Sequence, residues 1–278
     1  MVVTAASFLV DLPAPQPPRY NLLATAQLVN EADPHWGQGV SGRAYPLGET
    51  AEGWTYEVGT VVPEKPDIES DRMVHGKAFT VVYSYGCTRA GLDPADYQAR
   101  ARQVFAAVEP KIVEEQLWTN PLGVDAPTLD SDNDPSGADS LTVLNSGTAV
   151  KPSLGLALLE QFAAESILSP VIHARPGVVS VLGGDFEESG PNTIQTAALG
   201  TPVVAGAGYP GTGKDGAAMS GQSEWVFVSG PVMIWRDTVD VLESFDRSVN
   251  DYKLTVERQY LVLFDWGLQA VVKVDKSA

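Results

Sequence analysis

Cysteine is almost missing from this sequence: Cys87 is the single one in 278 residues. One cysteine excludes an intrachain disulfide, and because free cysteines are commonly buried, we expect Cys87 to be a small core residue rather than a nucleophile. The histidines (His35, His75 and His173) lie far apart, without a carboxylate or cysteine at metal-ligand spacing. The sequence therefore predicts neither a metal site nor a cofactor.

Basic residues are also few. The chain carries 18 Lys and Arg against 35 Asp and Glu, for a formal net charge of −17. No run of lysine or arginine forms a local patch. Because an acidic surface repels phosphate backbones, direct nucleic-acid binding is disfavoured.

Long hydrophobic runs are missing as well. No apolar stretch approaches the ~20 residues that a membrane-spanning helix needs, so we expect no membrane contact. Residues 1–20 include a short apolar stretch without a basic residue before it, which does not fit a signal peptide. The expected product is cytosolic.

One long helical pattern is present, over residues 92–118. Asp93 occupies an N-cap position and Pro94 the first helical turn. An apolar stripe follows at three- and four-residue spacing: Tyr97, Ala101, Val104, Phe105, Val108 and Ile112. Pro110 has no amide donor, so we expect a kink in a continuous helix there. A helix of this length is typical of a spine on which strands are laid.

Before this helix, the sequence predicts an arm and a hairpin. The prolines in residues 1–20 favour an extended arm, residues 21–30 a short helix, and residues 33–53 a loop. Residues 54–62 and 77–85 are rich in β-branched and aromatic side chains and are joined by a polar, proline-bearing connection. This pattern predicts a projecting two-stranded hairpin that needs a partner surface.

Aromatic residues gather in the same region, outside the expected core: Trp36, Trp54, Tyr56, Phe79, Tyr83 and Tyr85. Aromatic side chains on projecting elements often anchor interfaces, and a local mini-core is the alternative. The candidate subunit-contact residues are Trp54, Tyr56, Lys77, Phe79 and Tyr83.

After the long helix, residues 119–142 are rich in turn formers. The acidic run at 130–140 lacks the closing Glu and flanking helices of a calcium loop, so a solvated loop is expected. Residues 153–168 are apolar on nearly all sides, which predicts a buried helix. Strands are expected at residues 178–182, 201–205, 225–235, 239–245, 253–265 and 268–274. This order of elements defines an α+β fold.

The sharpest chemical motif is AGYPGTGKDG, in which Gly208 to Lys214 matches a phosphate-binding loop. However, Asp215 stands where a Ser or Thr should bind magnesium, and residues 216–225 lack the periodicity of the helix that would hold the anion. A glycine-rich connecting loop is favoured, with a nucleotide-binding enzyme as the alternative.

Other residues give no convincing active site. His173 lies in an expected strand and is interpreted as a core or edge residue. The adjacent acids Glu114–Glu115 and Glu187–Glu188 point apart on regular elements and are interpreted as solvated. No nucleophile-elbow pattern is present, although a dispersed triad stays open. We therefore expect a protein that is not an enzyme.

The order of elements resembles the major capsid proteins of tailed bacteriophages, whose Hong Kong 97-type fold is shared with encapsulin shells. The resemblance rests on four stretches: GLDPADYQARARQVFAAVEPKIVEEQLW, ALLEQFAAESILSPVIHARP, LGTPVVAGAGYPGTG and WVFVSGPVMIWRDTVDVLESFDRSVNDYKLTVERQYLVLFD. They are similar to capsid proteins of phages that infect actinobacteria. The resemblance covers most of the chain through its architecture rather than through motifs.

This resemblance implies a phage capsid-type fold with an N-terminal arm (1–53), an extended hairpin loop (54–91), a peripheral domain with the spine helix (92–150), an axial domain (151–235) and closing strands of the peripheral domain (236–278). Some family members crosslink a lysine to an asparagine. Lys77 is the one candidate donor here, and no matched partner is present, so no crosslink is predicted.

The implied function is self-assembly, through pentamers and hexamers in the host cytoplasm, into the icosahedral head shell of a tailed bacteriophage. The shell encloses DNA without sequence-specific binding, which suits an acidic inner wall. Scaffolding or decoration proteins are further partners that the resemblance allows. A phage tail or baseplate structural protein is the alternative.

Overall fold

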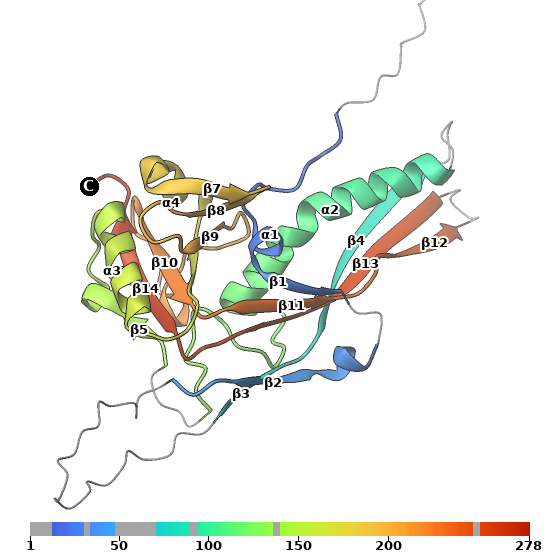
Figure 1. The fold of residues 1–278 in the computed structure, drawn as a ribbon. Helices are drawn as coiled ribbons and strands as arrows, with labels where there is room; N and C mark the ends of the chain where they lie inside the picture. Colours follow the sequence, from blue (N-terminus) through green and yellow to red (C-terminus); the bar gives the residue numbers. More distant parts are fainter. Residues whose placement is uncertain (1–12, 31–33, 48–70, 89–93, 136–139, 247–250) are drawn as a thin grey trace, which may run out of the picture.

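A long helix, α2 (Pro94–Thr119), runs through the computed structural model of the protein (Figure 1). The structure describes residues 13–30, 34–47, 71–88, 94–135, 140–246 and 251–278. As predicted, α2 begins at Pro94 and continues through Pro110. The expected N-cap, Asp93, lies outside the described residues, and the kink stays a prediction.

The first half of α2 packs against a five-stranded sheet. Its order is β1 (Gln27–Asn30), β11 (Val232–Arg236), β13 (Asp251–Phe264) and β12 (Asp240–Asp246), and β4 (Phe79–Thr88) pairs with the other side of β13. One face of β13 buries Leu254, Val256 and Tyr260 in the same cluster as Tyr97 and Phe105 of α2. The predicted strands at 239–245 and 253–265 are thus confirmed.

The second sheet has seven strands. Its order is β5 (Thr142–Val143), β14 (Gln269–Asp275), β10 (Ser223–Ser229), β6 (Val171–Ala174), β9 (Pro202–Ala205), β8 (Thr193–Thr196) and β7 (Phe186–Gly190). Helices α3 (Pro152–Ala164) and α4 (Pro176–Val181) pack on one face. Short 3-10 turns occur at Leu144–Gly147, Gly183–Asp185 and Lys214–Gly216.

Successive side chains of β10 point to opposite faces of the sheet and contribute to two hydrophobic cores. Val226 and Val228 point to the side of α3, where they share a cluster with Leu159. Phe227 points to the other side and meets the indole of Trp118, with ring centroids 4.7 Å apart in an edge-on arrangement. Helix α2 therefore contacts one sheet with its first half and the other with its last turn.

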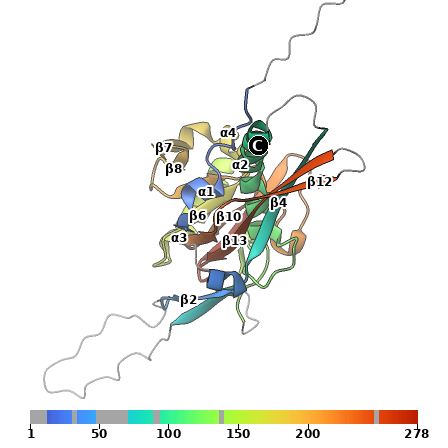
Figure 2. The same cartoon turned by 90° about the vertical axis from the view of Figure 1, so that its right-hand side faces the viewer.

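A separate two-stranded ribbon extends below the main body (Figures 1 and 2). It pairs β2 (Val40–Ala44) with β3 (Arg72–Gly76), and a 3-10 turn, η1 (Pro34–Gln38), precedes it. Trp36 is buried here with Val74, Leu261 and Leu263. For Trp36, the mini-core interpretation is correct.

Several local predictions before α2 are wrong in whole or in part. The short helix expected in residues 21–30 is present as a single turn, α1 (Leu22–Thr25), but the rest of the segment forms β1, which runs parallel to β11. The expected loop at 33–53 contains β2, and the expected polar connection contains β3. Long-range strand pairing decided these cases, since neither segment has a strong local pattern.

The expected hairpin is also corrected. Strand β4, predicted at residues 77–85, pairs with β13 over Phe79–Thr88 instead of forming a free ribbon. Its expected partner, residues 54–62, lies outside the described residues, as does the side chain of Cys87. The first part of the predicted hairpin therefore stays untested, and its second strand belongs to the main sheet.

Two later predictions need correction. Residues 178–182 were expected as a strand, but α4 covers all of them except Leu182, with Pro176 in its first turn. The expected strand at 225–235 is divided at Gly230 and Pro231, so β10 and β11 join different sheets. By contrast, the predicted strands at 201–205 and 268–274 match β9 and β14.

The expected boundary at residue 235 does not separate the two sheets. Strand β11 precedes it but lies in the five-stranded sheet, and β14 follows it but pairs with β10 in the seven-stranded sheet. The chain crosses between sheets twice after Ser229. The predicted α+β class is confirmed.

Candidate assembly surfaces

The predicted subunit-contact residues fall into three environments. Trp54 and Tyr56 lie outside the described residues. Lys77 is half-exposed, with its Nζ 3.6 Å from Oδ2 of Asp125. Phe79 is buried against Tyr260 in the core, with ring centroids 6.0 Å apart, and Tyr83 is half-buried against the same core. The expectation that these aromatics lie outside the core is therefore wrong for Phe79.

Other apolar side chains are exposed on the described surface. They include Tyr45, Met73, Val82, Leu122, Leu154, Ile167, Val181, Leu199, Leu242 and Phe245. Helix α3 ends at Ala164 and leaves Leu154 51% exposed, so it is not buried on all sides as predicted. Exposed apolar residues scattered singly are normal, so their distribution matters more than their number.

An open groove of about 640 Å³ lies between the segment that joins α1 to β1 and the end of α3. Leu199, Pro231 and Val232 are among its lining residues, and Leu199 is 65% exposed. The lining is mainly apolar, with Glu160 as its one ionisable side chain. This groove is an accessible apolar surface of the subunit.

In the phosphate-loop motif, the groups that would bind a phosphate make contacts within the chain instead. The amide of Gly208 donates to Oε2 of Glu114 at 2.8 Å, and a Cβ at Gly208 would lie 1.9 Å from the carbonyl oxygen of Lys111. Lys214 pairs with Asp132 through Nζ and Oδ2, 2.7 Å apart. A short 3-10 turn follows, where nucleotide binding would need a helix. The geometry is that of the predicted connecting loop.

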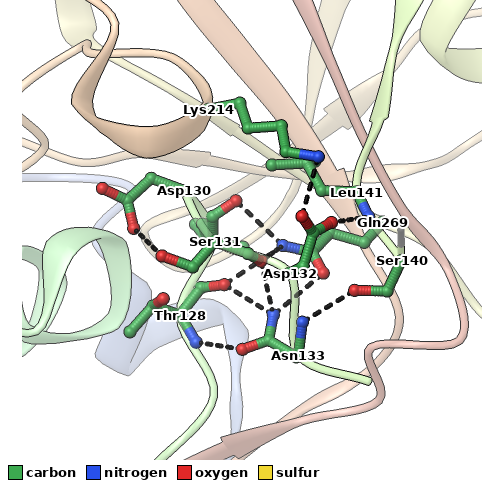
Figure 3. A network of polar contacts seen from close by, with 10 residues as sticks. Thr128, Asp130, Ser131, Asp132, Asn133, Ser140, Leu141, Lys214 and Gln269 are labelled. Atoms are coloured by element: carbon green, nitrogen blue, oxygen red, sulfur yellow. Dashed lines mark hydrogen bonds and ion pairs between the residues drawn. The ribbon is translucent and has the colours of Figure 1, made fainter. Parts of the chain in front are cut away.

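The acidic run after α2 is built into the fold rather than solvated throughout (Figure 3). The side-chain amide of Asn133 donates to Oε1 of Gln269 at 2.9 Å, and the side-chain amide of Gln269 donates to the carbonyl of Leu129, also at 2.9 Å. Burial raises the pKa of Asp130. For Asp132, burial acts to raise the pKa, but hydrogen bonds from Lys214 and from the Leu141 amide lower it overall. This network fixes the loop to the start of β14.

His173 is a core residue, as the sequence predicts. Its Nδ1 lies 2.8 Å from the hydroxyl of Tyr209 and its Nε2 lies 2.9 Å from Oγ of Ser229. Because Ser229 donates its hydroxyl proton to the carbonyl of Gly230, Oγ accepts from Nε2, and Nδ1 accepts from Tyr209. Burial lowers the pKa of His173 to about 3, so the ring is neutral.

A second buried polar cluster, the α2–β13 joint, connects these two elements through Glu109, Arg258 and Tyr260. Arg258 Nη1 lies 3.1 Å from Oε2 of Glu109, and the Tyr260 hydroxyl donates to the same oxygen at 2.6 Å. Burial, followed by the charge of Glu109, raises the pKa of Tyr260, which keeps its proton. Beyond residue types, nothing in the sequence indicates this joint, because its partners lie 149 positions apart.

The acid pairs differ from prediction at one position. Glu187 and Glu188 are exposed, as expected, and Glu188 accepts from Arg19 and Tyr20. Glu115 is exposed, but Glu114 is fully buried on α2. The interpretation of Glu114 as solvated is therefore wrong.

Within the described ranges, no helix is both long and apolar enough to cross a lipid bilayer. The same residues include no group of His, Cys, Asp or Glu side chains placed to hold a metal ion.

Comparison with solved structures identifies the fold. The capsid of an empty GTA particle, computed with C5 symmetry, matches with a TM-score of 0.61 at 10% identity, over 98% of this chain and 96% of that chain. A structure of Mycobacterium phage Cain matches with a TM-score of 0.59 at 15% identity, over 100% and 96%. The holo-SrpI encapsulin complex from Synechococcus elongatus matches with a TM-score of 0.56 at 13% identity, over 99% and 94%.

These likenesses extend over nearly the whole chain in both directions. The protein has the Hong Kong 97-type fold of phage capsid proteins and encapsulins, which confirms the resemblance seen in the sequence. No protein-family model and no curated protein matches the sequence. At this level of identity, the arrangement of elements carries the similarity, and individual residues do not.

Proposed function

We propose that this chain is the repeating subunit of the icosahedral head shell of a tailed bacteriophage. The observation that carries the proposal is the fold match over 98% of this chain and 96% of a GTA capsid chain. A shared fold alone does not fix function. The exposed apolar side chains and the open groove supply surfaces that a shell subunit would bury against its neighbours.

In this proposal the subunits form pentamers and hexamers. The parts of the arm (1–53) and of the hairpin region (54–91) that do not belong to α1, β1 or β4 reach neighbouring subunits, with Trp54, Tyr56 and Lys77 as contact residues. The spine region (92–150), the axial region (151–235) and the closing strands (236–278) make the body. Burial of apolar area at several interfaces per subunit stabilises the shell, as in obligate oligomers.

The shell encloses DNA without sequence-specific contacts and assembles in the host cytoplasm, with scaffolding or decoration proteins as further partners. The role is structural, and the protein performs no catalysis. An encapsulin-type shell around protein cargo is the second candidate, favoured by the match to the holo-SrpI encapsulin complex.

The size and contents of the purified native assembly test the proposal. Light scattering and negative-stain microscopy should show closed megadalton shells or five- and six-fold rings. Nuclease-protected DNA inside the shells would support a phage head, and protein cargo would support an encapsulin. Tubes or stacked rings would indicate a tail protein, and a monomer at every concentration would contradict the proposal.

A further inference from the structure

Tyr20 has a backbone conformation that is rare for an aromatic residue. Its φ angle is +56°, in the left-handed region, where the Cβ of an L-residue crowds the following carbonyl oxygen. Such a conformation persists only where surrounding contacts hold it in place. Tyr20 stands between α1 and the exposed residues 13–17, so its conformation sets the direction in which the N-terminal tail (residues 13–19) leaves the body (Figure 1).

The side of the turn nearer to α1 is held by backbone groups. The Tyr20 carbonyl accepts the amide of Ala205 at 2.8 Å. The side chain of Asn21 donates through Nδ2 to the Pro18 carbonyl at 2.7 Å and accepts the amide of Ala24 through Oδ1 at 3.1 Å. These contacts fix α1 and the turn to the body.

The tail side of the turn is held by one carboxylate. Oε1 of Glu188 accepts from Nη2 of Arg19 at 2.9 Å and from the hydroxyl of Tyr20 at 2.6 Å. The Arg19 guanidinium also lies over the Tyr20 ring, 4.8 Å from its centroid. Glu188 is on β7, at the edge of the seven-stranded sheet, where the pairing register shifts between Glu188 and Gly190. Such irregularities re-aim side chains at sheet edges.

These tail contacts are open to solvent. The side chains of Arg19 and Glu188 are 63% and 62% exposed, and exposed pairs contribute little to stability because water and salt screen them. The left-handed conformation of Tyr20 offsets part of that contribution. The bound arrangement is therefore close in free energy to one in which Glu188 is released and Tyr20 has a negative φ.

We propose that Glu188 is a latch for the N-terminal tail, which holds Arg19 and Tyr20 so that the tail leaves the body in one fixed direction. When the latch is released, Tyr20 returns to a negative φ and the tail takes a different direction. In a shell, the latch would govern which neighbouring surface the tail can reach. The latch itself rests on contacts within one chain and does not depend on shell assembly.

Trypsin digestion of the full chain tests the latch, because trypsin cleaves after arginine and Arg19 is part of the latch. Cleavage requires the bonds to Glu188 to open, so its rate follows the fraction of open molecules. Glu188→Ala should raise the rate of release of residues 1–19, measured by mass spectrometry, on the order of tenfold. Dividing by the rate of cleavage after Arg102, in α2, corrects for general unfolding. Light scattering ensures that the variants are compared in the same assembly state.

A neighbouring acid supplies the matched control. Glu187 is exposed on β7 and accepts from Nε2 of Gln195 at 2.7 Å, so Glu187→Ala should leave the normalised rate unchanged. Tyr20→Phe removes only the hydroxyl and should raise the rate about threefold. In the double variant with Glu188→Ala, Tyr20→Phe should add nothing, because the acceptor of the hydroxyl is already gone.

A second pair of variants tests the backbone strain. Tyr20→Ala and Tyr20→Asn both remove the ring and the hydroxyl, but asparagine adopts the left-handed region more readily than alanine. Release of residues 1–19 should therefore be faster for Tyr20→Ala than for Tyr20→Asn.

Three results would each overturn the proposal. The first is an equal normalised rate for the wild type and Glu188→Ala, and the second is an increase for Glu187→Ala as large as that for Glu188→Ala. The third is a set of multiplying effects for Tyr20→Phe and Glu188→Ala, since independent action excludes a shared bond. Equal rates for Tyr20→Ala and Tyr20→Asn would overturn the change of φ on release.

Discussion

At the residue scale, His173 and Glu114 titrate with opposite consequences for stability. Burial lowers the pKa of His173 to about 3, so the unfolded chain binds its proton first as the pH falls. Stability from this residue is complete above about pH 6.5 and is lost as the pH falls toward 3. Glu114 has the reverse sign, since the folded chain keeps its proton up to about pH 7. The two contributions to stability oppose each other over the pH range in which both groups titrate.

His173→Gln should reduce the acid sensitivity of folding. The wild type is expected to lose about 2 to 3 kcal/mol from His173 between about pH 7 and pH 4.5, an amount that the variant does not lose. The variant should be less stable near pH 7, because the bond from Tyr209 is weakened. Urea unfolding at each pH measures the free energy of unfolding of the wild type and of the variant. If the two free energies change with pH in parallel, the result contradicts a neutral, buried imidazole at His173.

At the element scale, the attachment of α2 to β13 depends on the joint of Glu109, Arg258 and Tyr260. Arg258→Met leaves the Glu109 carboxylate buried without its cation, which should cost about 3 to 5 kcal/mol in denaturant unfolding. Adding Glu109→Gln should recover much of that loss, because the uncompensated charge disappears.

The exposed pair of Arg19 and Glu188, whose Nη2 and Oε1 atoms lie 2.9 Å apart, is the matched control. Arg19→Met should change the free energy of unfolding far less than Arg258→Met, since water and salt screen exposed pairs. Equal losses for Arg258→Met and Arg19→Met would mean that burial of the α2–β13 joint has no energetic consequence.

At the scale of the whole molecule, the net charge of −17 opposes close packing of many copies. If the chain forms a shell, assembly should become more complete as salt rises from about 20 mM to about 300 mM, because the Debye length falls from roughly 20 Å to below 10 Å. Sedimentation or light scattering at fixed protein concentration measures the assembled fraction. Assembly that weakens with added salt would point instead to attraction between oppositely charged faces.

The parts of the fold that were predicted carry strong local signals. Helix α2 has Pro94 at its start and a helical apolar stripe, and β13 alternates apolar and polar side chains over many residues. Predictions that rested on weaker local patterns were wrong where contacts with distant segments determined the secondary structure. Among the described residues, strands β2 and β3 pair only with each other, and the valines of α4 lie in a helix that packs on the seven-stranded sheet.

The placement of individual residues could also be predicted only in part. Lys77 could be placed at the surface and Gly208 in a connecting loop from residue types and spacing alone. The sequence could not show that Phe79 is in the core or that Glu114 is buried, since each depends on an element far away in the chain.

The α+β class, the long spine helix, the C-terminal strands and the excess of negative charge can all be predicted from the amino-acid sequence, because they follow from local periodicity and composition. Which strands share a sheet, and which polar side chains lie inside, became known from the folded structure alone. Strand pairing and side-chain burial depend on contacts between segments that are far apart in the sequence, so they cannot be predicted from the neighbouring residues.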